Sequence, residues 1–598
     1  MPKRGGGPGA TDKAKDFKGS LKKLLKRVSD YKILIIMSFI FAIGSTVFAI
    51  ISPKILGNAT TEIFNGLIAK IGGTGGINFD TIKNILITLG ILYVISALFS
   101  YIQSLIMTSV SQKTSYKLRK EVSHKLNRLP MSYFDKQSTG DILSIITNDI
   151  DTIQLNLNQS ATQLVSSIVT VVGIFIMMCS INVTLAILTA LVLPIASVIV
   201  MLIVKKSQKH FVNQQKYLAE VDAEIEEMVS GHSVIKAFNA EDKTIGQFDE
   251  DNKKLFEAGF KSQFLSGLMH PIMNFVGNLN YAIIAIVGAI LAIKGKITVG
   301  NIQSFIQYSK QFTNPIAQLA QISSQIQSMI AASERVFNFL DTDEYVDNGK
   351  LKADAVVGDI EFKHVKFGYN EDKIIIKDFN AKVKTGEKIA IVGPTGAGKT
   401  TIVKLLMRFY ELNDGEILLD GKNITEYKRS ELESVFAMVL QDTWLFNGTI
   451  LDNLRYGNLN ASDKEVIDAA KLANADYFIR TLPDGYNMIL NEETSNISGG
   501  QKQLLTIARA ILANPKVLIL DEATSNVDTR TEELIQKAMD KVMEGRTSFI
   551  IAHRLSTIKN ADLILVMNEG DIVEVGKHEE LLKKDGFYAK IYNSQFEK

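Results

Sequence analysis

Residues 391–401 read Ile-Val-Gly-Pro-Thr-Gly-Ala-Gly-Lys-Thr-Thr, which is a complete phosphate-binding loop. The sequence predicts a short apolar strand before the loop, Lys388–Val392, and a helix after it, Thr400–Tyr410. Strand, loop, Lys-Thr pair and helix in this order argue against a chance glycine turn. Three glycines would let backbone amides curl around phosphate oxygens at the helix N-terminus: Gly393, Gly396 and Gly398.

The whole loop is therefore a candidate nucleotide site. Lys399 would neutralise negative charge on the β- and γ-phosphates, and the Thr400 hydroxyl would bind Mg²⁺. The predicted nucleotide-binding residues of the loop are Gly393, Pro394, Thr395, Gly396, Ala397, Gly398, Lys399, Thr400 and Thr401.

A second predicted strand, Val517–Leu520, is followed by Asp521 and Glu522. An apolar strand with terminal acids fits a buried parallel strand that opens on a ligand crevice. Asp521 would hold Mg²⁺ through water, and Glu522 would polarise the water that attacks the γ-phosphate. Such a strand is by itself mostly structural, and the complete loop upstream is what favours the catalytic interpretation.

The third predicted strand, Thr547–Ala552, delivers His553 at its C-terminal end. A lone histidine is more often a packing or surface residue than a catalyst. Because all three strands are expected to end beside the phosphates, His553 joins Glu522 as a candidate catalytic residue.

A glycine pair opens another predicted helix, Gln501–Leu512, which Asn514-Pro515 would stop. Ser498 is a good N-cap, so plain helix capping is one explanation of this stretch. The alternative is that Gly499 and Gly500 expose backbone amides to an anion, since no local carboxylate needs them.

The N-terminal half contains long apolar runs that can each cross ~30 Å of hydrocarbon. Six candidate spans follow: 33–52, 85–110, 162–181, 185–204, 264–293 and 301–330. The first three contain no Asp, Glu, Lys or Arg, the fourth is interrupted only by Pro194, and the sixth is the weakest.

Basic residues set the predicted orientation. Ten Lys and Arg residues lie in 1–32, seven in 111–160 and nine in 205–261, against three in 53–84. This bias predicts cytoplasmic N- and C-termini in the cell membrane. Residues 1–32 also predict an amphipathic helix on the membrane surface, because apolar residues recur at helical spacing among lysines: Leu21, Leu24, Leu25 and Val28.

Two inner connections, 111–160 and 205–263, have helical patterns, so the membrane helices are expected to continue into the cytoplasm. The predicted fold is an α-helical six-span transmembrane domain with long cytoplasmic helical extensions, followed by an α/β P-loop nucleotide-binding domain. The predicted parts are a tail with the interfacial helix (1–32), the transmembrane domain (33–340), a polar, acidic linker (341–357) and the nucleotide-binding domain (358–598).

Further motifs follow the phosphate-binding loop: Ile-Ser-Gly-Gly-Gln at 497–501, Leu-Asp-Glu-Ala-Thr-Ser at 520–525, and Asp528. With them the chain resembles a half-transporter of the ATP-binding cassette (ABC) exporters over nearly its whole length. The motifs occur in the family's order and approximate spacing. The resemblance implies ATP-driven export with ATP and Mg²⁺. It also implies that two such chains close on two nucleotides, so the chain should work only as a dimer.

The resemblance assigns further roles. Tyr369 would stack on adenine, His553 would contact the γ-phosphate, and Asp528 would belong to the loop that crosses between subunits. Gln441 would link Mg²⁺ to the membrane domain, so that the expected Mg²⁺ ligands are Thr400, Gln441 and Asp521. The signature residues would contact ATP held by the opposite subunit: Ser498, Gly499, Gly500 and Gln501.

The segment Leu129–Asp135, continuing through Thr139–Asp141, resembles the family's first intracellular coupling region, and Glu227–Glu241 resembles the second. Both are expected to dock near Gln441–Phe446. Trp444 within that stretch is either an interface aromatic or an ordinary core residue.

Two features depart from the family's pattern. Ile497 stands where the family usually has leucine, and Asn491–Ser495 replaces a stretch that commonly contains glycine. The chain's own loop residues and Glu522 look intact. This combination resembles the subunit of a heterodimer whose ATP is hydrolysed against a partner's better signature. We therefore favour a heterodimer over a homodimer, which stays open.

A row of amides marks the sixth predicted span. Seven recur at steps of four or three, which puts them on one helical face: Gln303, Gln307, Gln311, Asn314, Gln318, Gln321 and Gln325. Amides are costly to expose to lipid. The first five, with Lys310 nearby, are therefore candidates for the wall of a substrate cavity. The alternative is hydrogen bonding between helices.

No Asp or Glu lies in the clearest membrane runs, which favours a nucleotide-driven pump over an ion-coupled carrier. The predicted function is multidrug-type export of a hydrophobic or amphipathic small molecule by one half of a dimeric transporter. A homodimeric lipid or peptide exporter, a soluble cassette ATPase and a non-pumping membrane regulator are the alternatives. A net charge of +2 gives no sign of a nucleic-acid partner.

Overall fold

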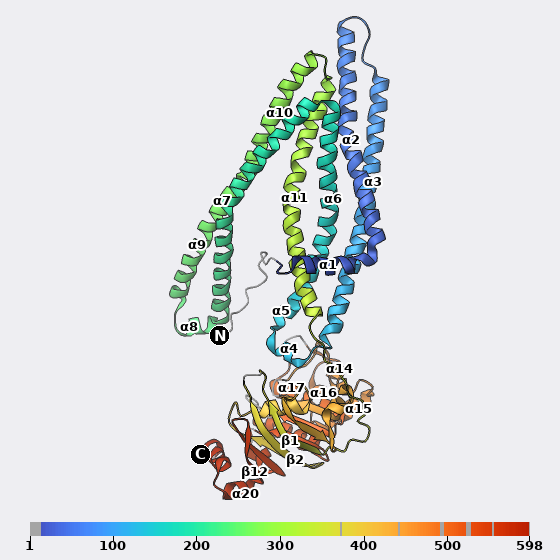
Figure 1. Ribbon diagram of the computed structural model, residues 1–598. Helices are drawn as coiled ribbons and strands as arrows, with labels where there is room; N and C mark the ends of the chain where they lie inside the picture. Colours follow the sequence, from blue (N-terminus) through green and yellow to red (C-terminus); the bar gives the residue numbers. More distant parts are fainter. Residues whose placement is uncertain are drawn as a thin grey trace. The chain divides into compact units, whose positions relative to one another are not determined.

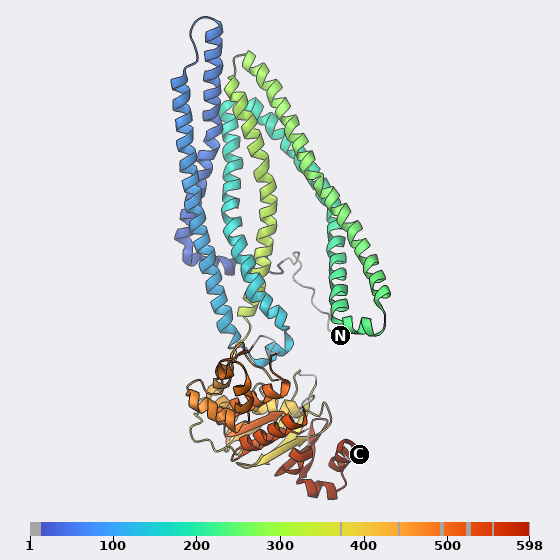
Figure 2. The same ribbon diagram turned by 180° about the vertical axis from the view of Figure 1, so that it is seen from behind.

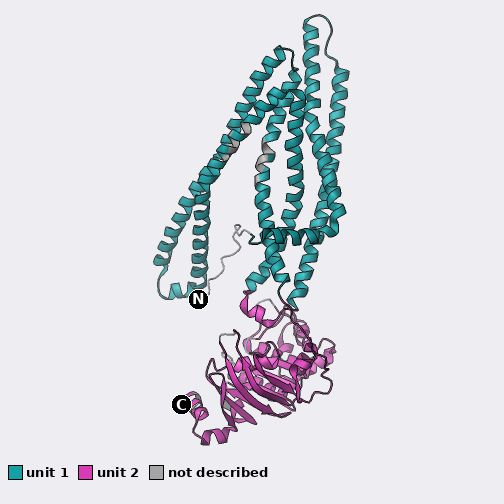
Figure 3. Ribbon diagram, viewed as in Figure 1, with its two compact units in different colours: residues 1–127, 139–342 teal, residues 128–138, 343–598 magenta. Residues whose placement is uncertain are grey.

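The computed structural model describes residues 14–370, 373–440, 443–490, 496–521, 528–552 and 555–596 of the 598-residue chain. The chain divides into two compact units (Figure 3). Unit 1 comprises residues 1–127 and 139–342, and unit 2 comprises residues 128–138 and 343–598. The short segment 128–138 therefore packs with the C-terminal part of the chain, although in sequence it lies between helices of unit 1.

Unit 1 is built of helices (Figure 1). They are α1 (Phe17–Val28), η1 (Ser29–Tyr31), α2 (Lys32–Ile71), α3 (Phe79–Leu126), α5 (Thr139–Ser144), η2 (Ile145–Asp149), α6 (Ile150–Ile181), α7 (Val183–Ser230), α8 (His232–Ala237), α9 (Glu241–Gly267), α10 (Met269–Ile293) and α11 (Val299–Leu340). Helices α2, α3, α6 and α11 pack together. Helices α7, α9 and α10 form an arm that diverges from them toward α8, as the opposite view in Figure 2 also shows.

In the part of the chain that the structure describes, four helical stretches have the length and apolar composition to cross a membrane: Phe17–Ile71, Phe79–Leu126, Thr139–Ile181 and Glu241–Ile293. These stretches contain four of the six predicted spans. The remaining two predicted spans lie on α7 and α11, which are 48 and 42 residues long. The membrane domain is thus helical as predicted, since a helix satisfies its own backbone in a bilayer. The count of six spans stays a prediction.

The centre of unit 1 is an apolar core around Phe305 and Tyr308 of α11. The Tyr308 hydroxyl donates to the carbonyl of Ile50 at 2.8 Å, and the Ser304 hydroxyl donates to that of Pro53 at 2.9 Å. Both acceptors lie on α2, and one of them is the carbonyl of the proline inside that helix. These bonds pair polar side chains of α11 with the backbone of α2 instead of leaving them in an apolar environment.

The predicted helical extensions are present. Helix α3 continues to Leu126, and α7, α8 and α9 fill the second connection. Between α5 and α6 the chain forms the π-helical turn η2, which ends in Asp149. The Asp149 carboxylate is 3% exposed and accepts two hydrogen bonds from the guanidinium of Arg335 on α11, at 2.9 and 2.5 Å. An ion pair therefore joins this turn to the end of α11.

Helix α1 is amphipathic, but its four apolar residues do not share one environment. Leu24 and Val28 are buried where α1 packs on α11 and α3, whereas Leu25 is 59% exposed and Leu21 is half-buried. One part of the predicted apolar face thus packs against other helices, and the other part is exposed.

Unit 2 contains two larger sheets and a two-stranded one. Strands β12-β11-β3-β10-β9-β6 form a sheet in which only the edge strand β12 is antiparallel, and β2-β1-β4-β5 is antiparallel throughout. The strands are β1 (Ile360–Phe367), β2 (Ile376–Val383), β3 (Lys388–Val392), β4 (Asp414–Leu419), β5 (Lys422–Asn423), β6 (Phe436–Val439), β7 (Gly448–Thr449), β8 (Ile489–Leu490), β9 (Val517–Asp521), β10 (Thr547–Ile551), β11 (Leu563–Asn568) and β12 (Asp571–Gly576).

Beside its sheets unit 2 contains helices, which gives it the predicted α/β architecture. They are α4 (Met131–Lys136), α12 (Lys399–Leu406), η3 (Ile424–Glu426), α13 (Arg429–Val435), α14 (Ile450–Arg455), α15 (Asp463–Leu472), α16 (Asp476–Thr481), η4 (Gly485–Asn487), α17 (Gly499–Ala513), α18 (Thr529–Met543), α19 (Leu555–Lys559), α20 (His578–Lys583) and α21 (Phe587–Phe596).

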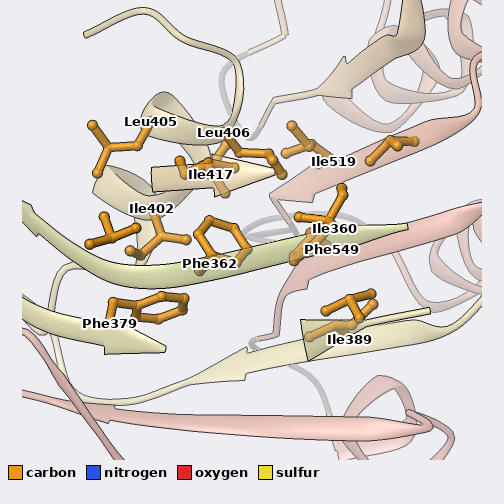
Figure 4. Close-up of a cluster of buried hydrophobic side chains, with 14 of the residues drawn as sticks. Ile360, Phe362, Phe379, Ile389, Ile402, Leu405, Leu406, Ile417, Ile519 and Phe549 are labelled. Carbon is orange, nitrogen blue, oxygen red and sulfur yellow. The ribbon is translucent and has the colours of Figure 1, made fainter. Parts of the chain in front are cut away.

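The main core of unit 2 lies between the two larger sheets (Figure 4). The ring centroids of Phe362 and Phe379, from the antiparallel sheet, are 5.1 Å apart, and that of Phe549 on β10 is 6.2 Å from Phe362. Ile402 and Leu405 of α12 enter the same core. This packing fixes α12, and with it the loop that precedes it.

Helix α12 is shorter than predicted: it ends at Leu406, not at Tyr410. Arg408 adopts a left-handed backbone with φ of +54°, which breaks the helical run. The predicted strands Lys388–Val392, Val517–Leu520 and Thr547–Ala552 match β3, β9 and β10 to within one residue.

Candidate functional site

The C-terminal ends of the three predicted site strands, β3, β9 and β10, lie at the same edge of the sheet. In the parallel sheet β10 lies between β3 and β9, and Ile551 pairs with both Ile391 and Asp521. Gly393 therefore follows β3 near the carboxylate of Asp521. Glu522 and His553 come directly after β9 and β10 in the sequence and lie outside the described residues, so their catalytic roles stay predictions.

The phosphate-binding loop, Gly393–Lys399, requires its glycines. Gly396 and Gly398 have φ of +86° and +100°, where a side chain is strained. A β-carbon on Gly393 would collide with the backbone carbonyl of Met567 on β11, and one on Gly398 would lie 2.7 Å from Ile376. The loop is thus a close-fitting backbone turn at the start of α12.

Lys399 is held at the opening of this turn. Its ammonium donates to the carbonyls of Gly393 at 2.8 Å and Pro394 at 3.1 Å. Burial lowers the pKa of Lys399 below its ordinary value, and the negative charge of Asp521 partly offsets this. The cation and the carboxylate therefore face the same small region.

The other loop residues divide into an outer and an inner group. Pro394, Thr395, Gly396 and Thr400 are exposed. Ala397 is 2% exposed and belongs to the main core, and Thr401 is 7% exposed beneath the loop. Exposed amides and the Thr400 hydroxyl can contact a ligand, whereas Ala397 and Thr401 support the loop from inside.

This donor set fits a phosphate chain with a divalent cation. Backbone amides at a helix N-terminus and a lysine suit phosphate oxygens. The Thr400 hydroxyl and the Asp521 carboxylate supply oxygen ligands of the kind Mg²⁺ prefers. Gln441, the third predicted Mg²⁺ ligand, lies outside the described residues.

Tyr369, predicted to stack on adenine, sits half-buried in an aromatic cluster. Its ring packs edge-on against Phe367 at 5.1 Å and Tyr410 at 5.0 Å between centroids, and its hydroxyl is 3.3 Å from that of Thr401. The Lys404 ammonium lies 5.7 Å from the centre of its ring. The Tyr369 ring is therefore adjacent to the phosphate-binding loop, and its stacking on adenine stays a prediction.

Lys404 and Tyr410 connect this cluster to the first coupling segment. The carboxylate of Asp135 on α4 accepts from Lys404 at 3.3 Å and from the Tyr410 hydroxyl. Burial, followed by the contact with Asp135, raises the pKa of Tyr410 above its ordinary value. The sequence did not indicate this connection, since it predicted docking of the coupling segments near Gln441–Phe446.

The second predicted coupling segment is the turn around α8 in unit 1. Val234 and Phe238 are 58% and 78% exposed. Apolar side chains are thus presented at the end of the α7–α9 arm.

The signature residues open α17 as predicted. The Ser498 side chain accepts from the Gln501 amide at 3.3 Å, and the Gln501 side chain accepts from the Ser498 amide at 2.9 Å. This is a complete capping box, so the capping explanation is correct at the level of local structure. Gly499 is exposed with open space around its α-carbon, while Gly500 is buried.

Ile497 and Asp528 also have clear local roles. Ile497 is 6% exposed within an apolar core that includes α17 residues. Asp528 is the N-cap of α18 and accepts from the Thr531 amide at 3.0 Å. Hydrogen bonding to the side chain of Thr531, and then to its amide, lowers the pKa of the Asp528 carboxyl. Asp528 itself is exposed, so capping leaves it accessible to a second chain.

Sequence reasoning missed Arg509, which ties α17 to the stretch after Gln441. Its guanidinium donates to the carbonyls of Trp444 at 2.8 Å and Asn453 at 2.6 Å, and burial lowers its pKa. The indole of Trp444 is 70% exposed, so Trp444 is not an ordinary core residue of this chain. Only its backbone is fixed by the signature helix.

Three amides of α11 bond to neighbouring helices, which is the alternative to a cavity wall. Gln303 accepts from Thr60 of α2, Gln318 accepts from Ser167 of α6 at 3.4 Å, and Gln325 accepts from Ser160 of α6 at 3.1 Å. These three take part in interhelical bonding. Gln311 is exposed and Gln307 is half-buried, and the side chain of Asn314 lies outside the described ones.

Comparison with known proteins identifies the two halves of the chain. The family models of the ABC transporter transmembrane region and of the ABC transporter match residues 35–316 and 376–525. A fatty acid ABC transporter ATP-binding/permease protein of Mycobacterium tuberculosis is 42% identical over 98% of both chains. An uncharacterised ABC transporter ATP-binding protein of Bacillus subtilis is 42% identical over 98% of this chain and 96% of its own.

A more distant relative is an ATP-dependent lipid A-core flippase of Syntrophus aciditrophicus, 34% identical over 87% of this chain and 86% of its own. All of these similarities span both halves, so the membrane helices and the nucleotide site belong to one transporter chain. Proteins of this type act as membrane dimers. The chain belongs to the ABC transporters, as a half-transporter of the exporter type that couples ATP hydrolysis to transport across a membrane.

Proposed function

We propose that this half-transporter exports a lipid-like or fatty-acid-like amphipathic molecule across the cell membrane, with both termini in the cytoplasm. The observation that carries the ATP-driven part is the meeting of Lys399 and Asp521 at the common end of β3 and β9. The substrate class is supported by relatives named for fatty acids and for lipid A-core. Both fit the hydrophobic or amphipathic cargo predicted from the sequence.

In the proposed cycle the loop amides and Lys399 bind the phosphates of ATP, and Tyr369 stacks on its base. Thr400, Gln441 and Asp521 would hold Mg²⁺, which when bound supplies positive charge beside the phosphates. Glu522 polarises the attacking water, and His553 contacts the γ-phosphate. The first coupling segment then follows the loop through Asp135, Lys404 and Tyr410.

We also propose six membrane crossings, adding α7 and α11 to the four stretches that are long and apolar enough. Residues 1–32 would form the tail and interfacial helix, 33–340 the transmembrane domain, 341–357 the linker and 358–598 the nucleotide-binding domain. The proposed linker is supported by its position between the end of α11 at Leu340 and the start of β1 at Ile360.

The partner is proposed to be a second, different half-transporter. Support comes from Asn491–Ser495, the departure from the family's pattern just before the signature, which lies outside the described residues. Ile497 does not add to that support, because it is a core residue that can replace leucine.

Flux in proteoliposomes tests the proposal. Full-length protein, reconstituted with the chain that co-purifies with it, should accumulate a fluorescent fatty acid or lysolipid only when ATP and Mg²⁺ are present. Glu522→Gln should bind ATP but abolish accumulation. ATP hydrolysis without movement of any such lipid would favour the non-pumping regulator, and equal accumulation without ATP would contradict the proposal outright.

The amide row allows a more specific test of the substrate path. Gln307 and Gln311 form no hydrogen bond to a neighbouring helix within the described contacts, so they are the members of the row best placed to meet a substrate. Replacing both with leucine should change which lipids stimulate transport while basal ATPase activity persists. Gln318→Leu, which removes the bond to Ser167, should lower thermal stability instead. An unchanged substrate profile in the double variant would contradict a cavity at this face.

A further inference from the structure

Helix α1 carries two rows of side chains that the rest of unit 1 leaves partly or wholly exposed. The apolar row contains Phe17, Leu21 and Leu25, which follow one another at steps of four, and Phe17 and Leu25 are 39% and 59% exposed. Residues four apart lie above one another on a helix. An exposed apolar row on an amphipathic helix fits the boundary between headgroups and acyl chains of a membrane.

Next to it runs a row of cations, which we call the lysine row: Lys18, Lys22 and Lys26. All three are exposed, and none forms an ion pair within the described part of the chain. The neighbouring cations Lys23 and Arg27 differ, because they pair with Asp341 and Glu121 of unit 1. The lysine row thus leaves positive charge available at the helix surface.

A cavity of about 450 Å³ lies where the start of α1 meets α6 and α11. Its walls are largely apolar: Phe17 of α1, Leu164 of α6, and Leu319, Ile322 and Ile326 of α11 contribute, with Ser323 among them. Cavities that bind small molecules measure roughly 300–1,000 Å³. Phe17 belongs both to this wall and to the exposed apolar row, so the cavity adjoins the surface that carries the lysine row.

The cavity is separate from the predicted substrate path. Leu319, Ser323 and Gln327 follow one another at steps of four on a face of α11 different from the amide row. Seven residues further, on that same face, the Glu334 carboxylate accepts from the backbone amides of Lys15 and Asp16 at 2.8 and 2.9 Å. Glu334 therefore anchors the start of α1 beside the cavity and keeps Phe17 at its rim.

We propose that this site binds one anionic phospholipid, with its headgroup on the lysine row and an acyl chain in the cavity beside Phe17. The apolar walls select a hydrocarbon chain, and the unpaired lysines select a negative headgroup, each cation adding to the attraction near an anionic surface. The preceding segment 1–13 is a poorer occupant, because it consists mainly of glycine and polar or charged residues. The proposal does not depend on which molecule is exported.

Quenching of tryptophan by brominated lipids tests this site in the full-length assembly in nanodiscs. Trp444→Phe removes the single native tryptophan, and Phe17→Trp then places a reporter at the cavity rim. In a second protein Leu25→Trp places the reporter on the same apolar row, two turns from the cavity. The bilayers contain phosphatidylcholine with a minor fraction of phosphatidylglycerol, and bromine is carried on the acyl chains of one lipid or the other.

At position 17, brominated phosphatidylglycerol should quench the tryptophan fluorescence about tenfold more effectively per molecule than brominated phosphatidylcholine. At position 25 the two lipids should quench nearly equally. Changing all three residues of the lysine row to glutamine should remove the preference at position 17. In the matched control, glutamine replaces three lysines of α7: Lys205, Lys206 and Lys209. This control loses the same charge elsewhere and should retain the preference at position 17.

Ser323→Phe tests the acyl-chain half of the site, because it fills the cavity without altering charge. It should abolish the preference at position 17 while the assembly still purifies intact and hydrolyses ATP. Equal quenching by the two lipids at position 17 would overturn the proposal. An equal preference for phosphatidylglycerol at both reporter positions would also overturn it, because it would mean diffuse attraction of the lipid to the surface. A preference that survives Ser323→Phe would overturn it as well.

Discussion

Gly393 shows how a single α-carbon can decide nucleotide binding. A methyl group there would collide with the carbonyl of Met567, so the phosphate-binding loop would have to move away from β11. Gly393→Ala should weaken ATP binding about tenfold, a loss of roughly 1.4 kcal/mol, measured by titration with a fluorescent ATP analogue. Gly386→Ala is the control for general backbone strain, because Gly386 has a left-handed backbone, with φ of +81°, but open space around it and no part in the loop. Equal losses in both variants would show that general strain, and not loop geometry, is responsible.

Lys404 contacts the predicted coupling segment from α12, the helix that follows the phosphate-binding loop. Its ion pair with Asp135 is partly exposed, so losing it should cost the fold no more than about 1 kcal/mol. Lys404→Met should therefore leave ATP affinity nearly unchanged but reduce the stimulation of ATPase activity by transported substrate about threefold. Lys404→Arg should retain most of the stimulation. Lys464→Met removes an exposed lysine of α15 that forms no ion pair among the described residues, and it should behave like the unmodified protein. A loss of basal ATPase equal to the loss of stimulation would argue for damage to the loop itself.

The residue scale also shows where sequence reasoning works and where it stops. The loop and the Ser498 cap were predictable because each belongs to a short motif whose neighbours in sequence are its neighbours in space. The position of Asp521 was predictable because the C-terminal ends of parallel strands lie at one edge of a sheet. Lys404 and Arg509 were not, because their partners Asp135 and Trp444 lie far along the chain from them. Nothing in the spacing of a lysine or an arginine reveals a contact that only the folded chain creates.

At the scale of elements, the ion pair between η2 and α11 should be a main determinant of stability in unit 1. Arg335→Met would leave the carboxylate of Asp149, which is 3% exposed, without its bidentate partner. An unpaired buried charge should cost about 2–4 kcal/mol. The midpoint temperature at which intact protein is lost on heating should fall clearly. The double variant Asp149→Leu/Arg335→Met, which removes both charges, should recover most of that loss. If the double variant were as unstable as the single one, the packing of Arg335 and not its charge would be what matters.

The helices and strands themselves were more predictable than the residues at which they end and the elements that they contact. Apolar runs predicted the long helices of unit 1, and four-residue apolar strings predicted β3, β9 and β10, because burial on both faces leaves no alternation. The end of α12 at Leu406 was missed, since a non-glycine residue, Arg408, takes the left-handed conformation there. The π-helical turn η2 had no sequence signal at all. It is held in place by the pair between Asp149 and Arg335, which is a tertiary contact.

At the scale of the whole molecule, a half-transporter is incomplete without a second chain. The exposed Gly499 beside the Ser498 cap and the exposed Asp528 at the start of α18 are surfaces that this chain leaves available. Gly499 is predicted to contact a nucleotide held by the partner, and Asp528 is predicted to belong to the loop that crosses between subunits. If the partner is a different chain, it can supply the usual family stretch at one nucleotide site. If the partner is a second copy, both nucleotide sites carry the departure at Asn491–Ser495.

Photo-crosslinking in membranes of the native host separates the two assemblies. A benzophenone amino acid in place of Arg530, an exposed residue two positions after Asp528, should form an ATP-dependent adduct with whatever chain closes against α18. Glu522→Gln in the same protein should increase the yield, because the closed state would persist. For a heterodimer, mass spectrometry of the adduct should identify a different ABC half-transporter. The same probe at Lys464 should give no ATP-dependent adduct. An adduct of this chain with itself as the main product would contradict the heterodimer, and it would place two copies of the Asn491–Ser495 stretch at two equivalent nucleotide sites.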